Sequence, residues 1–393
     1  MAPTKVLIWA LIRPDKIGSF EDYLIALHDE ARRRGLSLVV CALHPFCGEL
    51  VRRLDGPHCV LERLPESATR SPIPLIQSLL RHRPDLVHTH FIGPASLSFP
   101  IIRWLFRARL VVTDHSSDQP GPDASRSQVR ALKRRAVSRS VDLYLPVSDY
   151  VAARLRRLLP GCEHKIKRLY NGIDTRRFRP LSEATNRQQW IEAHFDLPGD
   201  KHWLLFVGQL APEKGIDLCF PVVLELLERF PNWCFVIVGD GPLRRTLKLT
   251  IAQSPLRERI FLLGRRNDVD NLLRASTLFL APSTWGEAFG LMLAEASASA
   301  TAVMANRTGG IPEVVKDGIT GALIPPDQPE QLKPALTRLM ESPPLRETLG
   351  NQGREHVITM FEMRRMVQIT FEHYERLTPP HPGPRSGVPQ EEQ

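Results

Sequence analysis

The chain has 393 residues, of which 42% are hydrophobic and 24% are charged. This length predicts two domains at roughly 150 residues each, and the composition excludes a collagen-like, coiled-coil or largely disordered protein. The longest apolar runs, such as Val6 to Ile12, are far shorter than the ~20 residues that span a membrane. The six cysteines are scattered and form no C-x-x-C pair, which argues against a disulfide framework or a structural zinc site and favours a reducing, cytoplasmic location.

Basic residues are concentrated in the first half of the chain. Residues 1–180 contain 30 Lys and Arg against 17 Asp and Glu, a net +13, whereas the remainder has 22 against 26, a net −4. The basic clusters are Arg32 to Arg34, Arg103 to Arg109 and Arg126 to Arg139. No nucleic-acid partner is expected, because no helix-turn-helix, zinc-finger or RNP-type motif accompanies this charge. An anionic membrane surface and a solvated basic face both stay open as interpretations.

In chain order, short β-branched runs alternate with longer amphipathic stretches, which is the pattern of parallel βαβ units. The first run follows a single lysine and precedes no cleavage site, so it is predicted as a strand and not as a signal peptide. The first long helix is predicted over Ser19–Arg34. The strands predicted in the first half are Val6–Ile12, Leu38–Leu43, Leu86–Thr89, Leu110–Thr113, Leu143–Val147 and Ile166–Tyr170.

A second series of strands predicts a second domain. It consists of Trp203–Val207, Trp233–Val238, Ile260–Leu263, Leu278–Ala281, Ala302–Ala305 and Ala322–Ile324. We therefore expect domains at residues 1–180 and 201–354, joined by a polar linker at 181–200. Glu355–Leu377 is predicted as a last helix, and the Pro-rich residues 378–393 as a disordered tail. The expected fold is α/β, with two Rossmann-like doubly wound domains whose strands end at a shared cleft.

Glycine-rich turns follow two strands of the second half. In GQLAPEKG, glycines allow close backbone approach and Lys214 precedes a helix, which suits a phosphate or diphosphate; an ordinary turn with a surface lysine is the alternative. GDGPLR begins like a dinucleotide fingerprint, but Arg244 stands at the third glycine, so a nicotinamide cofactor is not expected. No GxxxxGK[ST] phosphate loop occurs.

The segment WGEAFGLMLAE is the most informative. Glu287 and Glu295 lie eight positions apart on either side of a helix start, separated by on the order of 10 Å. Between these two glutamates, the free amides of Phe289, Gly290 and Leu291 predict an anion site. Such an arrangement can hold a diphosphate while each carboxylate accepts hydrogen bonds from the hydroxyls of a sugar. Alternatively, Glu287 is a solvated loop residue and Glu295 a helix-surface residue.

Two features of the first half face the same predicted cleft. Gly18, followed by Ser19, opens the first helix and can supply a second phosphate contact. His88 and His90 end one strand with both side chains on one face. No third metal ligand is evident, so no metal site is expected, and one of the two imidazoles is predicted to be a polar cleft residue.

The segments GQLAPEKG, GDGPLR, GEAFGLMLAE and GGIPEVV together resemble the donor-binding half of retaining, nucleotide-sugar-dependent GT-B glycosyltransferases of family 4 (group 1). RPDLVHTHF, VVTDHS and YNGIDTRRFRP of the first half agree, so the resemblance runs from about Lys5 to Leu377. It implies a hexosyltransferase that uses a UDP- or GDP-linked sugar and a glycan or lipid-linked acceptor in polysaccharide or glycolipid synthesis. It implies no metal or other cofactor. If the first half serves such an acceptor, its basic charge leads us to expect a cytoplasmic protein that is peripheral to the inner face of the membrane.

Residue roles follow from this resemblance by position. Lys214 would bind the donor diphosphate, Glu287 the hydroxyls of the transferred sugar, and Glu295 the ribose. The amides of Phe289, Gly290 and Leu291 would contact the phosphates or the sugar.

The remaining roles concern both domains. Gly18 would approach the diphosphate from the first domain, and His90 would line the reacting sugar. Gly264 and Arg265 would lie along the nucleobase. The resemblance makes Glu287, His90 and Lys214 the candidate catalytic residues, and it implies that the final helix crosses back to the first domain.

Gln209 departs from the family pattern, which usually has arginine at this position. A glutamine cannot replace the bidentate, charged contact of arginine with a diphosphate. This substitution motivates an alternative function, a catalytically weak member that binds nucleotide or glycan as a partner subunit. A GT-B epimerase or phosphorylase is less favoured, because the chain is short for a phosphorylase of the glycogen type.

Overall fold

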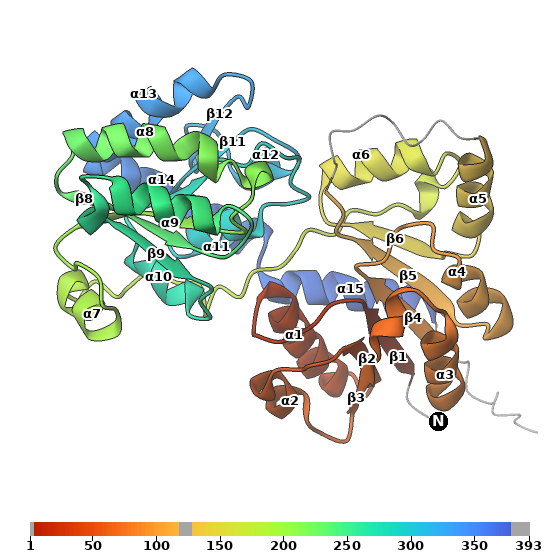
Figure 1. Cartoon of the computed structure of the whole chain (residues 1–393). Coiled ribbons are helices and arrows are strands. Elements are labelled where there is room, and N and C mark those ends of the chain that lie inside the picture. The colour runs from red at the N-terminus through yellow and green to blue at the C-terminus, as the bar shows by residue number, and fades with distance from the viewer. Residues whose placement is uncertain (1–3, 118–127, 379–393) are drawn as a thin grey trace, which may run out of the picture.

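The computed structural model describes residues 4–117 and 128–378, which form two lobes (Figure 1). The predicted tail lies outside the described residues from position 379 onward. Each lobe is built on a six-stranded parallel sheet, in the orders β3-β2-β1-β4-β5-β6 and β12-β11-β10-β7-β8-β9. Both orders are those of the doubly wound dinucleotide-binding fold. The predicted fold class is therefore confirmed.

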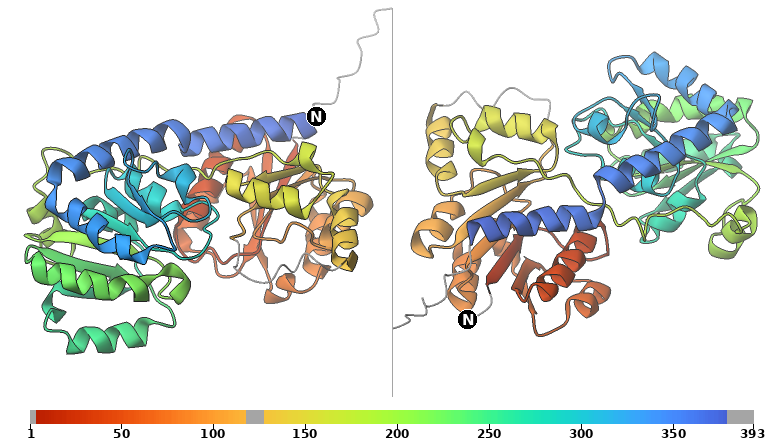
Figure 2. Two further views of the ribbon diagram at one scale, coloured as in Figure 1. Left: turned by 90° about the horizontal axis from the view of Figure 1, so that it is seen from above. Right: turned by 180° about the vertical axis from the view of Figure 1, so that it is seen from behind.

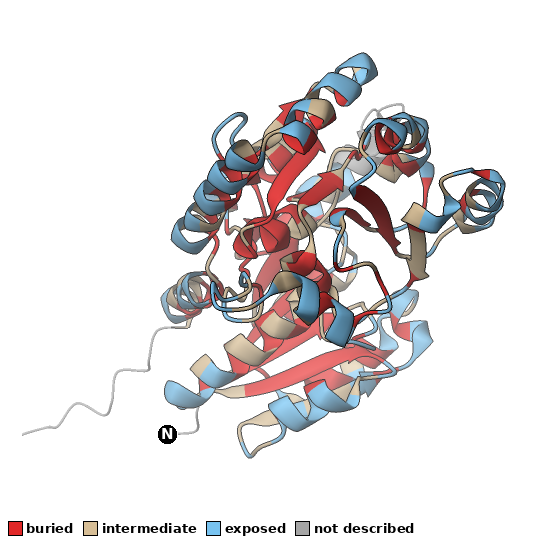
Figure 3. Ribbon diagram, turned by 90° about the vertical axis from the view of Figure 1, so that its left-hand side faces the viewer, coloured by how far each residue is buried: buried red, intermediate tan, exposed pale blue. Residues whose placement is uncertain are grey.

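The strands are short and apolar because helices cover both faces of each sheet (Figure 3). The first sheet contains β1 (Lys5–Ala10), β2 (Ser37–Leu43), β3 (Cys59–Leu64), β4 (Leu86–His90), β5 (Arg109–Asp114) and β6 (Leu143–Pro146). The second contains β7 (His202–Val207), β8 (Trp233–Val238), β9 (Ile260–Gly264), β10 (Leu278–Ala281), β11 (Ala302–Asn306) and β12 (Ala322–Ile324).

One predicted strand is wrong and one strand was not predicted. Ile166–Tyr170 forms only an isolated bridge to Tyr144, although its backbone runs along the free edge of β6. β3 lies at the other edge of this sheet, where its sequence CVLERL carries charged residues. Polar residues are typical of edge strands, and here they obscured the apolar pattern.

Helices surround the sheets. The first domain has α1 (Ser19–Arg33), α2 (Gly48–Leu54), α3 (Ile73–His82), α4 (Ser98–Pro100), α5 (Gln128–Ser138) and α6 (Asp149–Leu158). The second has α7 (Arg187–His194), α8 (Ile216–Arg229), α9 (Arg244–Gln253), α10 (Val269–Ala275), α11 (Leu291–Ala298), α12 (Ile311–Val314) and α13 (Leu332–Glu341).

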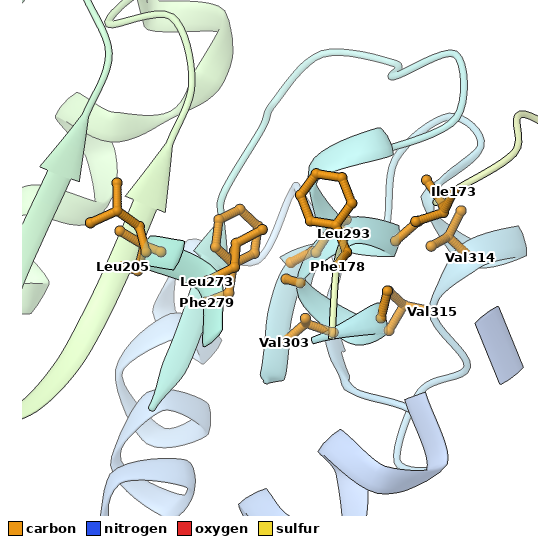
Figure 4. Close-up of a cluster of buried hydrophobic side chains, with 14 of the residues drawn as sticks. Ile173, Phe178, Leu205, Leu273, Phe279, Leu293, Val303, Val314 and Val315 are labelled. Carbon is orange, nitrogen blue, oxygen red and sulfur yellow. The ribbon is translucent and has the colours of Figure 1, made fainter. Parts of the chain in front are cut away.

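The core of the second domain includes residues from outside its predicted bounds. Phe178 belongs to the same buried cluster as Phe279 and Val303 of the sheet (Figure 4). Ile191 of α7 is part of this cluster too. Residues 181–200 were predicted as a polar linker. This prediction is wrong for Arg187–His194, because these residues form α7 and pack on the second domain. Its apolar positions are few, so helical periodicity did not reveal it.

The chain returns to the first domain through two helices. The single helix predicted over Glu355–Leu377 is wrong, because α14 (Pro343–Met360) ends and α15 (Met363–Leu377) begins within that range. α14 packs on α11, and α15 packs on α1. Figure 2 shows the two helices running nearly end to end across both lobes.

The two segments that connect the domains, one around Ile173 and one around Phe361, are hydrogen-bonded to each other. The Ile173 amide donates to the Phe361 carbonyl (2.7 Å), and the Met363 amide donates to the Ile173 carbonyl (3.1 Å). Gly172 is required beside them, since a Cβ there would lie 2.7 Å from the Met363 Cα. The break between α14 and α15 is therefore set by tertiary pairing with the residues Asn171 to Asp174.

No helix within residues 4–117 and 128–378 combines the length and the hydropathy that crossing a membrane requires.

Candidate active site

A cavity of about 400 Å³ lies between the domains, at the carboxyl ends of both sheets. In each sheet the strand order reverses between two strands, β1 and β4 in the first and β7 and β10 in the second. Ligands bind at such switch points in doubly wound folds. The segments after these four strands supply most of the predicted site. Residues of the prediction that line the cavity are His90, Gln209, Lys214, Glu287, Phe289, Gly290 and Leu291.

An ion pair lies on the second-domain wall of the cavity. The Lys214 Nζ is 2.5 Å from the Glu287 Oε1, and both side chains are partly exposed to the cavity. Lys214 ends a 3₁₀ turn after β7, where Gly215 adopts a left-handed conformation with φ +67°. A Cβ on Gly215 would lie 2.0 Å from the Pro282 carbonyl oxygen, so only glycine lets this turn pack against the end of β10. The lysine is thereby brought to the loop that carries Glu287.

The Glu287 loop is fixed by its neighbours on both sides. The Gly310 amide donates to the Glu287 carbonyl (2.7 Å), and the Thr308 hydroxyl donates to the Trp285 carbonyl (2.6 Å). From the first domain, the Ser148 hydroxyl donates to the Ala288 carbonyl (2.6 Å). A carboxylate on such a loop is preorganised for a ligand in the cavity.

α11 begins in the wall of the cavity. Its N-cap is Gly290, with φ +98°, and Leu291 is its first residue. The first amides of a helix lack intrahelical acceptors and carry the positive end of the helix dipole. They lie in the same wall as Lys214, so this wall is suited to an anion such as a diphosphate.

The first domain contributes imidazoles and aromatic rings. His90 is buried at the end of β4, with its Nδ1 3.1 Å from the Nε2 of His115, while its Nε2 has no partner among the described residues. Burial lowers the pKa of His90 well below its ordinary value and that of His115 to about 4, so both are neutral at neutral pH. Phe20 and Tyr23 of α1 surround the His90 ring.

The two strand-end histidines have different surroundings. His88 is buried between the Tyr374 hydroxyl of α15 and the Thr113 hydroxyl, each at 2.6 Å, and it does not line the cavity. His90 does line the cavity, as predicted for one of the pair. In the part of the chain that the structure describes, no group of three or more His, Cys, Asp or Glu side chains could hold a metal ion. The six cysteines are free thiols.

Glu295 is buried beneath the cavity and does not line it. Its carboxylate accepts a hydrogen bond from the Ser19 hydroxyl, the second residue of the predicted Gly18–Ser19 feature. Gly18 itself caps α1, and its amide donates to Glu21 Oε2 (2.9 Å). The alternative of a helix-surface role for Glu295 is wrong, because the first domain covers this carboxylate.

The burial of Glu295 predicts a pH-dependent stability. Burial raises the pKa of Glu295 from 4.5 to about 7. A raised folded-state pKa means that its contribution is fully present below about pH 4.5 and is lost as the pH rises through about 7. From about pH 6 to about pH 8 the wild type should lose about 1 kcal/mol of unfolding free energy relative to Glu295→Gln. Parallel thermal unfolding of both proteins across this range checks it, and parallel curves would contradict it.

A second pocket of about 650 Å³ adjoins the cavity and shares Gly208 and Gln209 with it. Arg265 lines this pocket, together with Arg266 and with Lys16 from the first domain. Gly264 does not line it; its carbonyl accepts from the Gly239 amide (2.8 Å). The two hollows together extend along the ends of β7, β8 and β9.

Several lining residues escaped the sequence analysis. They are Lys16, Phe20, Tyr23, Phe91 and Arg266. Phe20 and Tyr23 lie three positions apart directly after Gly18–Ser19, a spacing that also fits an ordinary core-facing helix. Lys16 lies two residues before this glycine, and its distance from the second domain in sequence hid its position in the cleft.

Comparison with known proteins agrees with this geometry. The family model described as Glycosyltransferase Family 4 matches residues 20–177, and that described as Glycosyl transferases group 1 matches residues 188–356. The alpha-D-kanosaminyltransferase of Streptomyces kanamyceticus is 30% identical over 278 residues, which cover 68% of this chain and 71% of that protein. The chain belongs to the group 1 glycosyltransferases of family 4.

Two further proteins resemble the chain over most of its length. The D-inositol 3-phosphate glycosyltransferase of Saccharomonospora viridis is 28% identical over 399 residues, covering 91% of this chain and 89% of that protein. The structure of Anabaena HepE, solved with UDP and glucose, matches with a TM-score of 0.76 at 19% identity, covering 95% of this chain and 99% of that one. This group 1 glycosyltransferase thus has the GT-B fold and is an enzyme that transfers sugars.

Proposed function

We propose that this glycosyltransferase moves a hexose from a UDP- or GDP-linked donor to a glycan or lipid-linked acceptor, with retention of anomeric configuration and without a metal ion. The observation that supports it is the Lys214–Glu287 pair, 2.5 Å apart, in the same cavity wall as the first amides of α11. The relatives named above act on sugars, and HepE was solved with UDP, so a nucleotide-sugar donor is the simplest ligand for this wall.

Each side chain then has a role that its position permits. Lys214 and the α11 amides would stabilise the negative charge that develops on the leaving diphosphate, as oxyanion-hole donors stabilise an acyl intermediate. Glu287 would accept hydrogen bonds from hydroxyls of the transferred sugar. The neutral His90, whose Nε2 has no partner among the described residues, could donate to or accept from the reacting sugar. Cationic groups at the diphosphate would make a metal unnecessary.

The nucleoside would occupy the second pocket. Arg265 would lie along the base, and Lys16 and Arg266 add positive charge to this hollow. Glu295 would bind the ribose only after the Ser19 hydroxyl has left its carboxylate. Nucleotide binding would therefore be coupled to a change at the domain contact.

Donor hydrolysis tests the proposal without knowledge of the acceptor. The enzyme is incubated with EDTA and UDP-glucose, UDP-N-acetylglucosamine or GDP-mannose, and the released sugar is followed by proton NMR. We expect one donor to be consumed with the α-anomer appearing first. The β-anomer appearing first would contradict retention, and a strict metal requirement would contradict the proposed role of Lys214.

Gln209 supports a second candidate function, a nucleotide- or glycan-binding partner subunit with weak activity. Gln209 lines both hollows where a positively charged side chain would face the diphosphate. Calorimetric titration with UDP, GDP and their sugars separates the two functions. Binding without hydrolysis or transfer would favour the partner subunit. A Gln209→Arg variant that gains turnover would show that this position limits catalysis.

A further inference from the structure

Large apolar side chains of the first domain are exposed on one short helical segment. α4 continues into a π-helical turn, Ile101–Leu105. Leu97, Trp104 and Leu105 are 64%, 68% and 69% exposed. Leu97 directly precedes α4, and Trp104 and Leu105 end the π-helical turn, so the three exposed side chains lie within nine residues of chain.

This segment is a fixed part of the domain. Phe99 and Ile102 on its inner side are fully buried in the core. The Trp104 indole Nε1 donates to the Ser140 hydroxyl (3.1 Å), which holds the ring against the end of the α5 segment. The outward apolar face is therefore presented by a packed helix.

α5 adds a further apolar side chain and basic residues. Leu132 is 71% exposed. Figure 1 shows α4 and α5 together at the edge of the first domain that is remote from the second domain. Neither residues 95–109 nor residues 132–141 contain an acidic residue. The exposed basic residues on these segments are Arg107, Lys133, Arg135 and Arg139.

We propose that this basic-apolar face, formed by Leu97, Trp104, Leu105 and Leu132 with Arg107, Lys133, Arg135 and Arg139, docks on an anionic lipid bilayer. Leucine side chains at such a face enter the acyl boundary, an indole lies at the headgroup level, and lysine and arginine contact anionic headgroups. Charge complementarity and the absence of acidic residues in both segments favour a leaflet over a neutral apolar partner.

The position of this face fits the proposed acceptor. Phe91 lines the cavity, and only five residues of chain separate it from Leu97, a span of at most about 22 Å. A headgroup-linked acceptor in the same leaflet could therefore reach the mouth of the cavity. The inference deepens the proposed function by adding a docking surface, although bilayer binding itself needs no sugar transfer.

Co-sedimentation with phosphatidylcholine vesicles, with and without phosphatidylglycerol, tests the proposal on the full chain. We expect binding only to the anionic vesicles, weakening as salt is added. Leu105→Glu and the double change Lys133→Glu/Arg135→Glu should each lower the bound fraction several-fold. Leu218→Glu and Arg245→Glu/Lys248→Glu, on exposed positions of the second domain, are the matched controls and should bind like the wild type.

A second measurement uses the indole as a depth probe. Brominated phospholipids should quench part of the tryptophan fluorescence, and Trp104→Phe should remove this quenching while leaving most of the binding. Equal binding to neutral vesicles, unchanged binding of Leu105→Glu or equal losses in the controls would overturn the proposal. The proposal would also be overturned if the chain formed a dimer that Leu105→Glu disrupts, or if it bound an acidic protein but no vesicles. Because neither assay contains a sugar donor, failure here leaves the proposed transferase activity intact, and loss of transferase activity leaves this result intact.

Discussion

Replacing Glu287 with glutamine is expected to lower kcat/KM by about 10²–10³, with little change in the thermal unfolding midpoint. The substitution keeps the shape of the side chain but removes the charge that faces Lys214 at 2.5 Å in the cavity. A partly exposed ion pair contributes about 0–1 kcal/mol to stability. A catalytic electrostatic contact contributes about 2.7–4 kcal/mol to the transition state, so the catalytic effect should dominate.

The matched control for this experiment is Glu228→Gln. Glu228 is exposed on α8, in the same domain, and the chemical change is identical. Its kinetics and unfolding midpoint should match those of the wild type. Initial rates of donor consumption, measured beside circular dichroism melts of all three proteins, provide both readouts. Full activity in Glu287→Gln would remove Glu287 from the proposed chemistry.

The second domain could be predicted from sequence because local and tertiary signals agree there. All six of its strands are apolar runs bounded by turns, and each predicted strand has a counterpart in the sheet. The turns at Lys214, at Glu287 and at Gly309 carry glycines that their conformations or close contacts require. Parallel strands with a switch point then bring these turns to one edge, so most of the donor wall could be predicted.

The rest of the site depends on contacts that no local pattern encodes. Ser19 and Glu295 are 276 residues apart in sequence, and their hydrogen bond exists only because the first residue of α1 meets α11 where the two domains touch. Likewise, Phe361 keeps the helical apolar spacing, yet the helix breaks there because the Phe361 carbonyl accepts from the Ile173 amide. Sequence alone therefore predicts each domain better than the contact between them.

Edge elements show the same limit within one domain. β3 carries Glu62 and Arg63 at the sheet edge, and Glu62 is held by Arg81 (2.5 Å) and His82 (2.7 Å) of α3. These two contacts explain how a glutamate is accommodated in the strand. Neither these contacts nor the strand itself could be inferred from the sequence of β3, because its six residues show no clear apolar alternation.

Gly309→Ala is expected to lower kcat/KM by roughly a hundredfold, although Gly309 donates no side chain to the cavity. Gly309 has φ +55°, and an added Cβ would lie 2.2 Å from the Glu287 carbonyl oxygen and 2.6 Å from the Glu287 nitrogen. These are backbone atoms and cannot rotate away, so the Glu287 loop must shift. A displacement of about 1 Å in a catalytic group can cost about 10² in rate.

Gly318→Ala separates this displacement from the cost of the backbone conformation. Gly318 has φ +71°, and a Cβ there meets nothing within 4 Å. Both variants therefore bear the left-handed strain of a non-glycine residue, about 1–2 kcal/mol, but only Gly309→Ala pushes on Glu287. We expect both melting temperatures to fall and only Gly309→Ala to lose most of its activity. Equal activity losses in the two variants would mean that strain alone, and not the position of Glu287, limits turnover.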